Sequence, residues 1–223
     1  MNNKTAAAAG ALITIIYLII REDFTMKLTE MNKTTLLENI YPILHPQLHP
    51  DAVSVHMKGM EDIEMGFCFD LSDGKIGGVT KQMLKEYSLT IEELLHAINT
   101  NPYEYQFKTL TQMLGLPDEL NDDMPSMYVL TNEKNFYGAG AFCVKSIVKD
   151  ILDFMKCDIF IFPSSKHELI IVPANSLCQD AKELTEMVHQ INQDMVEEKD
   201  RLSDNVYHLC YRTGVLSTLY YTE

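Results

Sequence analysis

The chain has 223 residues, 46% of them hydrophobic, which is enough material for a sizeable core in one or two domains. Its 32 acidic and 18 basic residues give a formal net charge of −14, which opposes direct binding to nucleic acid or to anionic membrane surfaces. A protein partner with a basic surface fits this charge better.

The N-terminal segment, residues 1–25, contains an apolar run over residues 6–20. As a helix this run would be about 22 Å long, which is short for a membrane-spanning helix of about 20 apolar residues. It is similar to a signal-peptide core but lacks the small residues of a cleavage site. We favour a third interpretation, in which translation starts at Met26 and the protein is cytoplasmic without membrane contact. If residues 1–25 are genuine, the alternative is a membrane-anchored or exported protein.

The first predicted helix starts at Thr34 or Thr35 and runs to Leu44 with its apolar side chains on one face, before prolines end it. The extended stretch that follows contains three histidines, His45, His49 and His56. Two of them precede proline, and none has a carboxylate at ligand spacing. We therefore predict no metal site here.

Alternating residues predict a strand over residues 64–71, and Gly77-Gly78 predicts a turn rather than a phosphate-binding loop. We expect no cofactor. A helix is predicted over residues 80–87, and a second begins at Thr90, which stands in capping-box spacing with Glu93.

Residues 103–116 fit a helix or a strand equally well, and residues 117–125 form an acidic loop. This loop is the best boundary in the chain. We accordingly divide it into an N-terminal α+β region, residues 26–117, and a C-terminal α+β region, residues 126–223, packed together as one unit.

The C-terminal region alternates strand and helix signals: a strand at 127–130, a helix over 144–155 entered through small residues, strands at 158–162 and 169–172, a helix at 180–194 and a strand at 206–211. The two middle strands have the spacing of a hairpin. This order predicts an α+β fold with a mainly antiparallel sheet and helices packed on it.

The hairpin connection holds the densest group of reactive side chains, namely Ser164, Ser165, His167 and Glu168. Neither the HExxH nor the GxSxG motif is present. We interpret the segment as a structural turn whose hydroxyls satisfy turn amides and whose His167 and Glu168 bond across the sheet. The alternative is a small hydrolase with a serine nucleophile and an imidazole base.

Five cysteines are widely spaced, and no CxxC pair occurs: Cys68, Cys143, Cys157, Cys178 and Cys210. This pattern predicts reduced thiols in a cytoplasmic protein rather than a disulfide framework. No motif places a histidine beside any of them, so a Cys–His nucleophile has no support from the sequence.

Several segments also occur, in this order, in a known group: 127–132 (MYVLTN), Gly138-Ala139, Pro163-Ser164-Ser165, and His167-Glu168. From about Thr34 onward the chain resembles the uncharacterised bacterial family called domain of unknown function 5688. Lys166 departs from the family pattern, in which a small apolar residue is commoner, and part of the family's N-terminal region is missing. The resemblance implies a group from gut Firmicutes, often in a mobile-element setting, with no established activity.

These observations favour a noncatalytic protein that works by protein contact, with a partner that is basic. An acidic accessory or anti-defence factor of a mobile element is the role that we expect. The hydrolase based on Ser165, His167 and Glu168 is the competing expectation.

Overall fold

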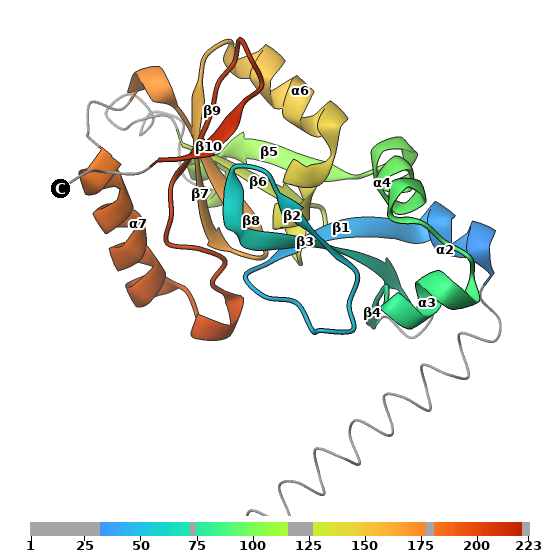
Figure 1. Ribbon diagram of the computed structural model, residues 1–223. Helices are drawn as coiled ribbons and strands as arrows, with labels where there is room; N and C mark the ends of the chain where they lie inside the picture. Colours follow the sequence, from blue (N-terminus) through green and yellow to red (C-terminus); the bar gives the residue numbers. More distant parts are fainter. Residues whose placement is uncertain (1–31, 72–74, 116–126, 177–180, 220–223) are drawn as a thin grey trace, which may run out of the picture.

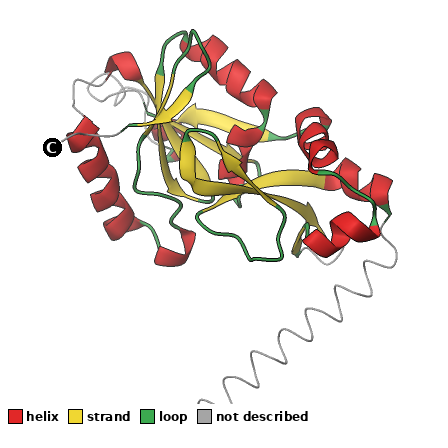
Figure 2. Ribbon diagram, in the orientation of Figure 1, coloured by secondary structure: helices red, strands yellow, loops and turns green. Residues whose placement is uncertain are grey.

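The computed structural model describes residues 32–71, 75–115, 127–176 and 181–219. In these ranges the chain forms two antiparallel sheets with helices around them (Figures 1 and 2), so the predicted α+β class is confirmed. The apolar run at 6–20 and the acidic loop at 117–125 lie outside the described residues. None of the helices within the described ranges is both long and apolar enough to cross a membrane.

The first sheet has the strand order β1-β3-β2, with β4 also paired to β3, and all of its pairs are antiparallel. Its strands are β1 (Ile40–His45), β2 (Ser54–Met57), β3 (Met60–Asp70) and β4 (Ile76–Gly78). The strand predicted at 64–71 is therefore present and starts earlier.

The prediction for the first helix is wrong in two respects, its N-cap residue and its last residue. Helix α2 covers only Lys33–Asn39, and Asn32 caps it by accepting a hydrogen bond from the Thr35 amide at 3.0 Å. The chain then enters β1, where Pro42 lies opposite Phe67. Proline cannot continue a helix, but it is tolerated on an edge strand, where no partner needs its missing N–H.

The turn predicted at Gly77-Gly78 is also wrong, because both glycines belong to β4. They pair with Phe69 and Cys68 of β3. Hydrogen bonds to a neighbouring strand outweigh the local turn preference of the two glycines, and a local pattern cannot reveal that partner.

The two predicted helices are confirmed, and so is the predicted capping box at Thr90. Thr80 caps α3 (Lys81–Glu86), and Thr90 caps α4 (Ile91–Thr100) in a complete capping box with Glu93. The ambiguous segment that follows contains both kinds of structure: β5 (Tyr105–Thr109) leads directly into the single turn α5 (Leu110–Met113).

The second sheet has the order β10-β9-β7-β8-β6-β5, again fully antiparallel. Its remaining strands are β6 (Tyr128–Asn132), β7 (Ile159–Ser165), β8 (Glu168–Pro173), β9 (Tyr207–Leu209) and β10 (Leu216–Thr218). The predicted hairpin is confirmed as β7–β8. Its turn is tighter than expected, because Ser165 pairs with Glu168 and leaves Lys166 and His167 between them.

The helical segments of the C-terminal half are α6 (Lys145–Met155), α7 (Ala181–Met195), and the 3-10 turns η2 (Gly138–Cys143), η3 (Ala174–Ser176) and η4 (Glu198–Asp200). Helix α7 lies on one side of the six-stranded sheet, and the first sheet and α6 lie on the other (Figure 1).

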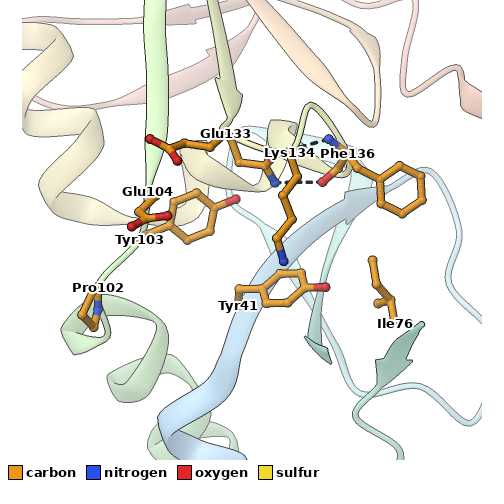
Figure 3. A pocket seen from close by; sticks show the side chains of 9 residues that line it. Tyr41, Ile76, Pro102, Tyr103, Glu104, Glu133, Lys134 and Phe136 are labelled. Atoms are coloured by element: carbon orange, nitrogen blue, oxygen red, sulfur yellow. Dashed lines mark hydrogen bonds between the residues drawn. The ribbon is translucent and has the colours of Figure 1, made fainter. Parts of the chain in front are cut away.

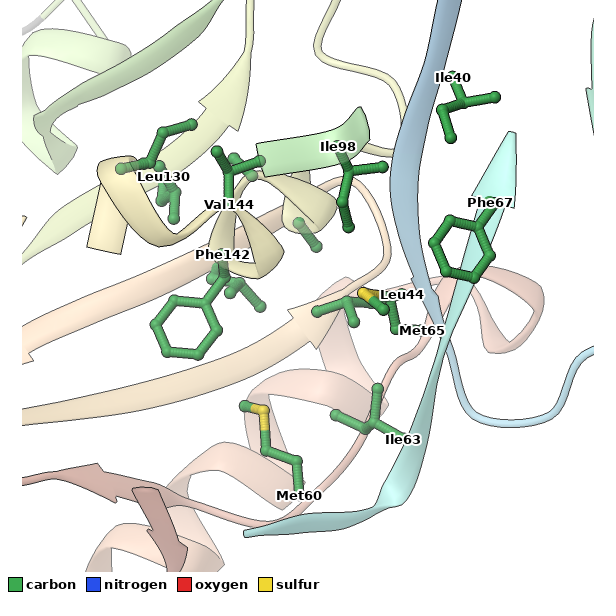
Figure 4. Packing of buried hydrophobic residues seen from close by; sticks show 14 of the residues in the cluster. Ile40, Leu44, Met60, Ile63, Met65, Phe67, Ile98, Leu130, Phe142 and Val144 are labelled. Atoms are coloured by element: carbon green, nitrogen blue, oxygen red, sulfur yellow. The ribbon is translucent and has the colours of Figure 1, made fainter. Parts of the chain in front are cut away.

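The core follows the alternation of side chains along β7. Ile159 and Ile161 belong to the main core, whereas Phe162 packs on the opposite face with Leu184 and Val188 of α7. Figure 4 shows the main core, which combines residues of the first sheet with residues of η2 and β6. It thus crosses the boundary that we drew at 117–125, although the division into two regions stays a prediction.

The segment η2 lies between the two sheets and comes very close to both. A Cβ atom at Gly140 would collide with the Pro42 carbonyl oxygen of β1, and one at Gly138 would collide with Thr131 of β6. Only glycine lets the backbones approach this closely, so these two positions set the distance between the sheets.

We predict that Gly140→Ala lowers the free energy of unfolding by about 1–3 kcal/mol, because the added methyl group has no space next to β1. Denaturant unfolding measures this change. Gly78→Ala is the matched control, since a Cβ at Gly78 meets nothing within 4 Å, and it should shift stability by less than about 0.5 kcal/mol. Equal effects of the two variants would contradict this account of η2.

Candidate functional site

The turn between β7 and β8 holds the residues that the sequence singled out. Ser164 and Ser165 are buried, with 6% and 8% of their surface exposed. The Ser165 Oγ accepts hydrogen bonds from the amides of His167 at 3.1 Å and Glu168 at 3.2 Å. This hydroxyl therefore closes the turn, as a serine side chain commonly does.

Both nitrogens of the His167 ring have neighbours. Nδ1 accepts a hydrogen bond from the Tyr137 amide at 3.1 Å, and Nε2 lies 3.4 Å from Asp200 Oδ1. Because Nδ1 is the acceptor, the neutral ring carries its proton on Nε2, next to the carboxylate. The ring of Phe136 stacks on the imidazole, with 5.1 Å between the centroids. The lone pair that a general base would use is thus bound to a backbone N–H.

Asp200 joins this group from η4. Lys166 Nζ lies 2.9 Å from Asp200 Oδ1, and both side chains are largely buried, at 12% and 21% exposure. The hydrogen bond from Lys166 holds the pKa of Asp200 below its usual value. Lys166 also donates to the Lys199 carbonyl at 3.1 Å and lies 5.2 Å from the centre of the Tyr137 ring. We call Tyr137, Lys166, His167 and Asp200 the turn cluster.

Sequence analysis did not find two members of the turn cluster. Asp200 lies in the acidic segment 197–200 and Tyr137 follows the polar segment 132–135, and neither segment carries a recognisable motif. Tyr137 has a left-handed backbone with φ of 53°, which is rare for tyrosine. No local pattern predicts either contact, since Tyr137 is 30 positions from His167 and Asp200 is 34 positions from Lys166.

A cavity of about 270 Å³ adjoins the turn cluster through Phe136, which lines the cavity and stacks on His167 (Figure 3). Its other lining residues are Tyr41, Ile76, Pro102, Tyr103, Glu104, Asn132, Glu133 and Lys134. The Asn132 side chain bonds the Phe136 backbone twice, at 2.8 and 3.2 Å, and so fixes the ring between cavity and imidazole. Burial raises the pKa of Tyr103 to about 12, so its hydroxyl stays protonated at neutral pH.

Comparison with known families decides where the chain belongs. Residues 53–211, well over half of the chain, match the family described as "Family of unknown function (DUF5688)". The chain belongs to this family. No curated protein and no solved structure matches it. The family resemblance seen in the sequence is thereby confirmed, and the matched part contains the β7–β8 turn and Asp200 of this DUF5688 chain.

The DUF5688 chain has a second group of bonded polar side chains at the other end of β7, next to its first residue. His208 Nε2 lies 3.0 Å from Asp158 Oδ2, and the Tyr211 amide donates to the other carboxylate oxygen at 2.9 Å. Cys210, two residues after His208, has a lowered pKa because Thr213 and neighbouring amides hydrogen-bond to its sulfur.

The three N-terminal histidines do not form a common site. His45 Nδ1 accepts from the Gln47 amide and His49 Nδ1 from the Asp51 amide, each at 3.2 Å, while His56 lies in β2. Across the described part of this DUF5688 chain, no three His, Cys, Asp or Glu side chains gather in a metal-binding arrangement. The expectations of no metal and no cofactor stay predictions.

We predict that Asp200→Asn removes part of the pH dependence of stability. The folded pKa of Asp200 lies below its unfolded value of about 3.9, so its stabilising effect is complete above that value and is lost as the pH falls through the folded pKa. The variant should be less stable than the wild type at pH 7, and the difference should shrink in acid.

Thermal unfolding measured from neutral pH to about pH 2 tests this prediction. Asp194→Asn, at an exposed position of α7, is the matched control and should leave the curve unchanged. If Asp200→Asn follows the wild type over the whole pH range, the Lys166–Asp200 pair does not stabilise the fold.

Proposed function

We propose that this DUF5688 protein acts without catalysis, by binding a protein partner with a basic surface. The cellular role we propose is that of an acidic accessory or anti-defence factor of a mobile element. The protein would occupy a basic site on its partner, and its excess of carboxylates would supply the attraction.

The observation that carries this proposal is the hydrogen bonding of Ser165 and His167 in the β7–β8 turn. The Ser165 hydroxyl accepts two turn amides, and the His167 Nδ1 accepts the Tyr137 amide. A nucleophile needs a base with a free lone pair close to its hydroxyl, and here that lone pair is already bonded to the backbone. Ser165 and His167, the residues best suited to catalysis in the sequence, therefore stabilise the folded turn.

The charge of the chain supports a basic partner. The 14 carboxylates in excess of Lys and Arg cannot all be neutralised within the chain, since the sequence offers 18 basic residues against 32 acidic ones. Several of the basic groups are already paired, for example Lys33 with Glu93 and Lys166 with Asp200. Such a surface attracts a basic partner over about a Debye length.

Affinity purification of the full chain from its host tests the proposal. A basic protein should be retained at moderate salt and released at high salt, because screening weakens attraction between surface charges. An unrelated acidic protein of similar net charge is the matched bait and should not retain the same partner. Recovery of no basic protein by the full chain would contradict the proposal.

The alternative is a small hydrolase centred on Ser165, His167 and Glu168, and the proximity of Asp200 to the His167 ring favours it. Ser165→Ala separates the two functions. If the serine is structural, the variant should lose about 1–3 kcal/mol of stability, because two turn amides lose their acceptor. Ser217→Ala, on an exposed position of β10, is the control. Unchanged stability together with a lost hydrolase activity would support the enzyme instead.

A further inference from the structure

One edge of the six-stranded sheet lies along β5. Within the described residues β5 pairs only with β6, so its other edge presents backbone N–H and C=O groups without a neighbouring strand. An unpaired edge of this kind is a template for the addition of a further strand.

A groove of about 720 Å³ follows this edge. All five residues of β5 line it, together with Asp150, Ile151 and Phe154 of α6, which lies beside β5 (Figure 1). Successive side chains of a strand point to opposite faces, so a groove that touches all five follows the edge of the strand rather than one face.

The wall of the groove is aromatic. Phe107 and Tyr128 stack with their centroids 5.1 Å apart, and Phe154 meets both rings edge-on at 6.0 and 5.7 Å. Phe154 is nevertheless 62% exposed. A large aromatic side chain that is held in position by its neighbours but left open to solvent is typical of the residues that dominate binding energy at protein interfaces.

The rim of the groove is mainly acidic. Glu133 and Asp150 line it, and the Tyr105 hydroxyl donates to Asp150 at 3.4 Å. Lys108 is the basic side chain among the lining residues, and its ammonium is bound to Gln106 at 2.9 Å. A lysine on an edge strand opposes pairing between two copies of the same edge, because the like charges repel.

We propose that this groove binds an extended segment of the partner protein as an added strand next to β5. The segment would carry basic side chains for Glu133 and Asp150, alternating with large apolar side chains that pack on Phe154. This inference rests on the proposed function, since it names the surface and the chemistry by which a basic partner is bound.

The probe is a fluorescein-labelled hexapeptide in which lysine alternates with valine or phenylalanine, titrated with the full chain and followed by fluorescence polarisation. Phe154→Ala should weaken binding by about tenfold or more. Val215→Ala is the matched control: this residue is 58% exposed but precedes β10, at the opposite edge of the sheet, and its loss should change nothing. The same peptide with glutamate in place of lysine, or with alternate amides methylated, should bind at least about tenfold more weakly.

Hydrogen exchange of the β5 amides gives a second readout. The β5 amides that point away from β6 should exchange quickly in the free chain and slowly with the peptide bound, whereas the amides bonded to β6 are protected in both states. Protection of the outward-pointing amides in the free chain would overturn the inference, since another segment or a second copy would already cover the edge. Equal peptide binding by wild type and Phe154→Ala would also overturn it, while a basic partner captured from the host by both proteins would leave the proposed function standing.

Discussion

The close approach of η2 to both sheets is the constraint on which the rest of the structure depends. Gly138 and Gly140 let a backbone with almost no side chain pass between β1 and β6, where even a methyl group would collide with a carbonyl or hydroxyl oxygen. Buried apolar neighbours, among them Phe142 and Val144, then fill the space on either side. A single main core results, to which both sheets contribute.

The turn cluster follows from this packing. The Thr131 hydroxyl donates to the His167 carbonyl at 2.9 Å, and the Ala139 amide donates to the Lys166 carbonyl at 3.3 Å. The first contact attaches the β7–β8 turn to β6, and the second attaches it to the start of η2. The strained backbone of Tyr137 lies directly before η2, and its amide points at His167. The imidazole is therefore oriented by the segment that connects the two sheets, and its position has a structural explanation.

A polar network joins the sheets at another place. Asp62 of β3 accepts hydrogen bonds from the Tyr207 hydroxyl of β9, from Ser203 and from Asn205. Tyr207 is fully buried, and burial raises its pKa, so the hydroxyl keeps the proton that it donates. Such a network has a defined geometry, which apolar packing alone does not impose. The edge along β5 and the exposed Phe154 of α6 take part in neither of these two contacts between the sheets.

The sequence by itself determined the parts of the fold that depend on near neighbours in the chain. Thr90 caps its helix as predicted, because a cap bonds an amide three residues away. The hairpin β7–β8 was predictable from two apolar runs with a short connection, and the α+β class from the order of elements.

Only the tertiary structure decided the rest. Pro42 and Gly77 lie in strands because β3 pairs with them, and Asp200 reaches Lys166 because η4 docks on the turn. Pro42 is 25 positions from its partner Phe67, Gly77 is 8 from Phe69, and Asp200 is 34 from Lys166. Each partner belongs to another element. Tertiary packing selects these partners, whereas a spacing pattern in the sequence describes only one element at a time.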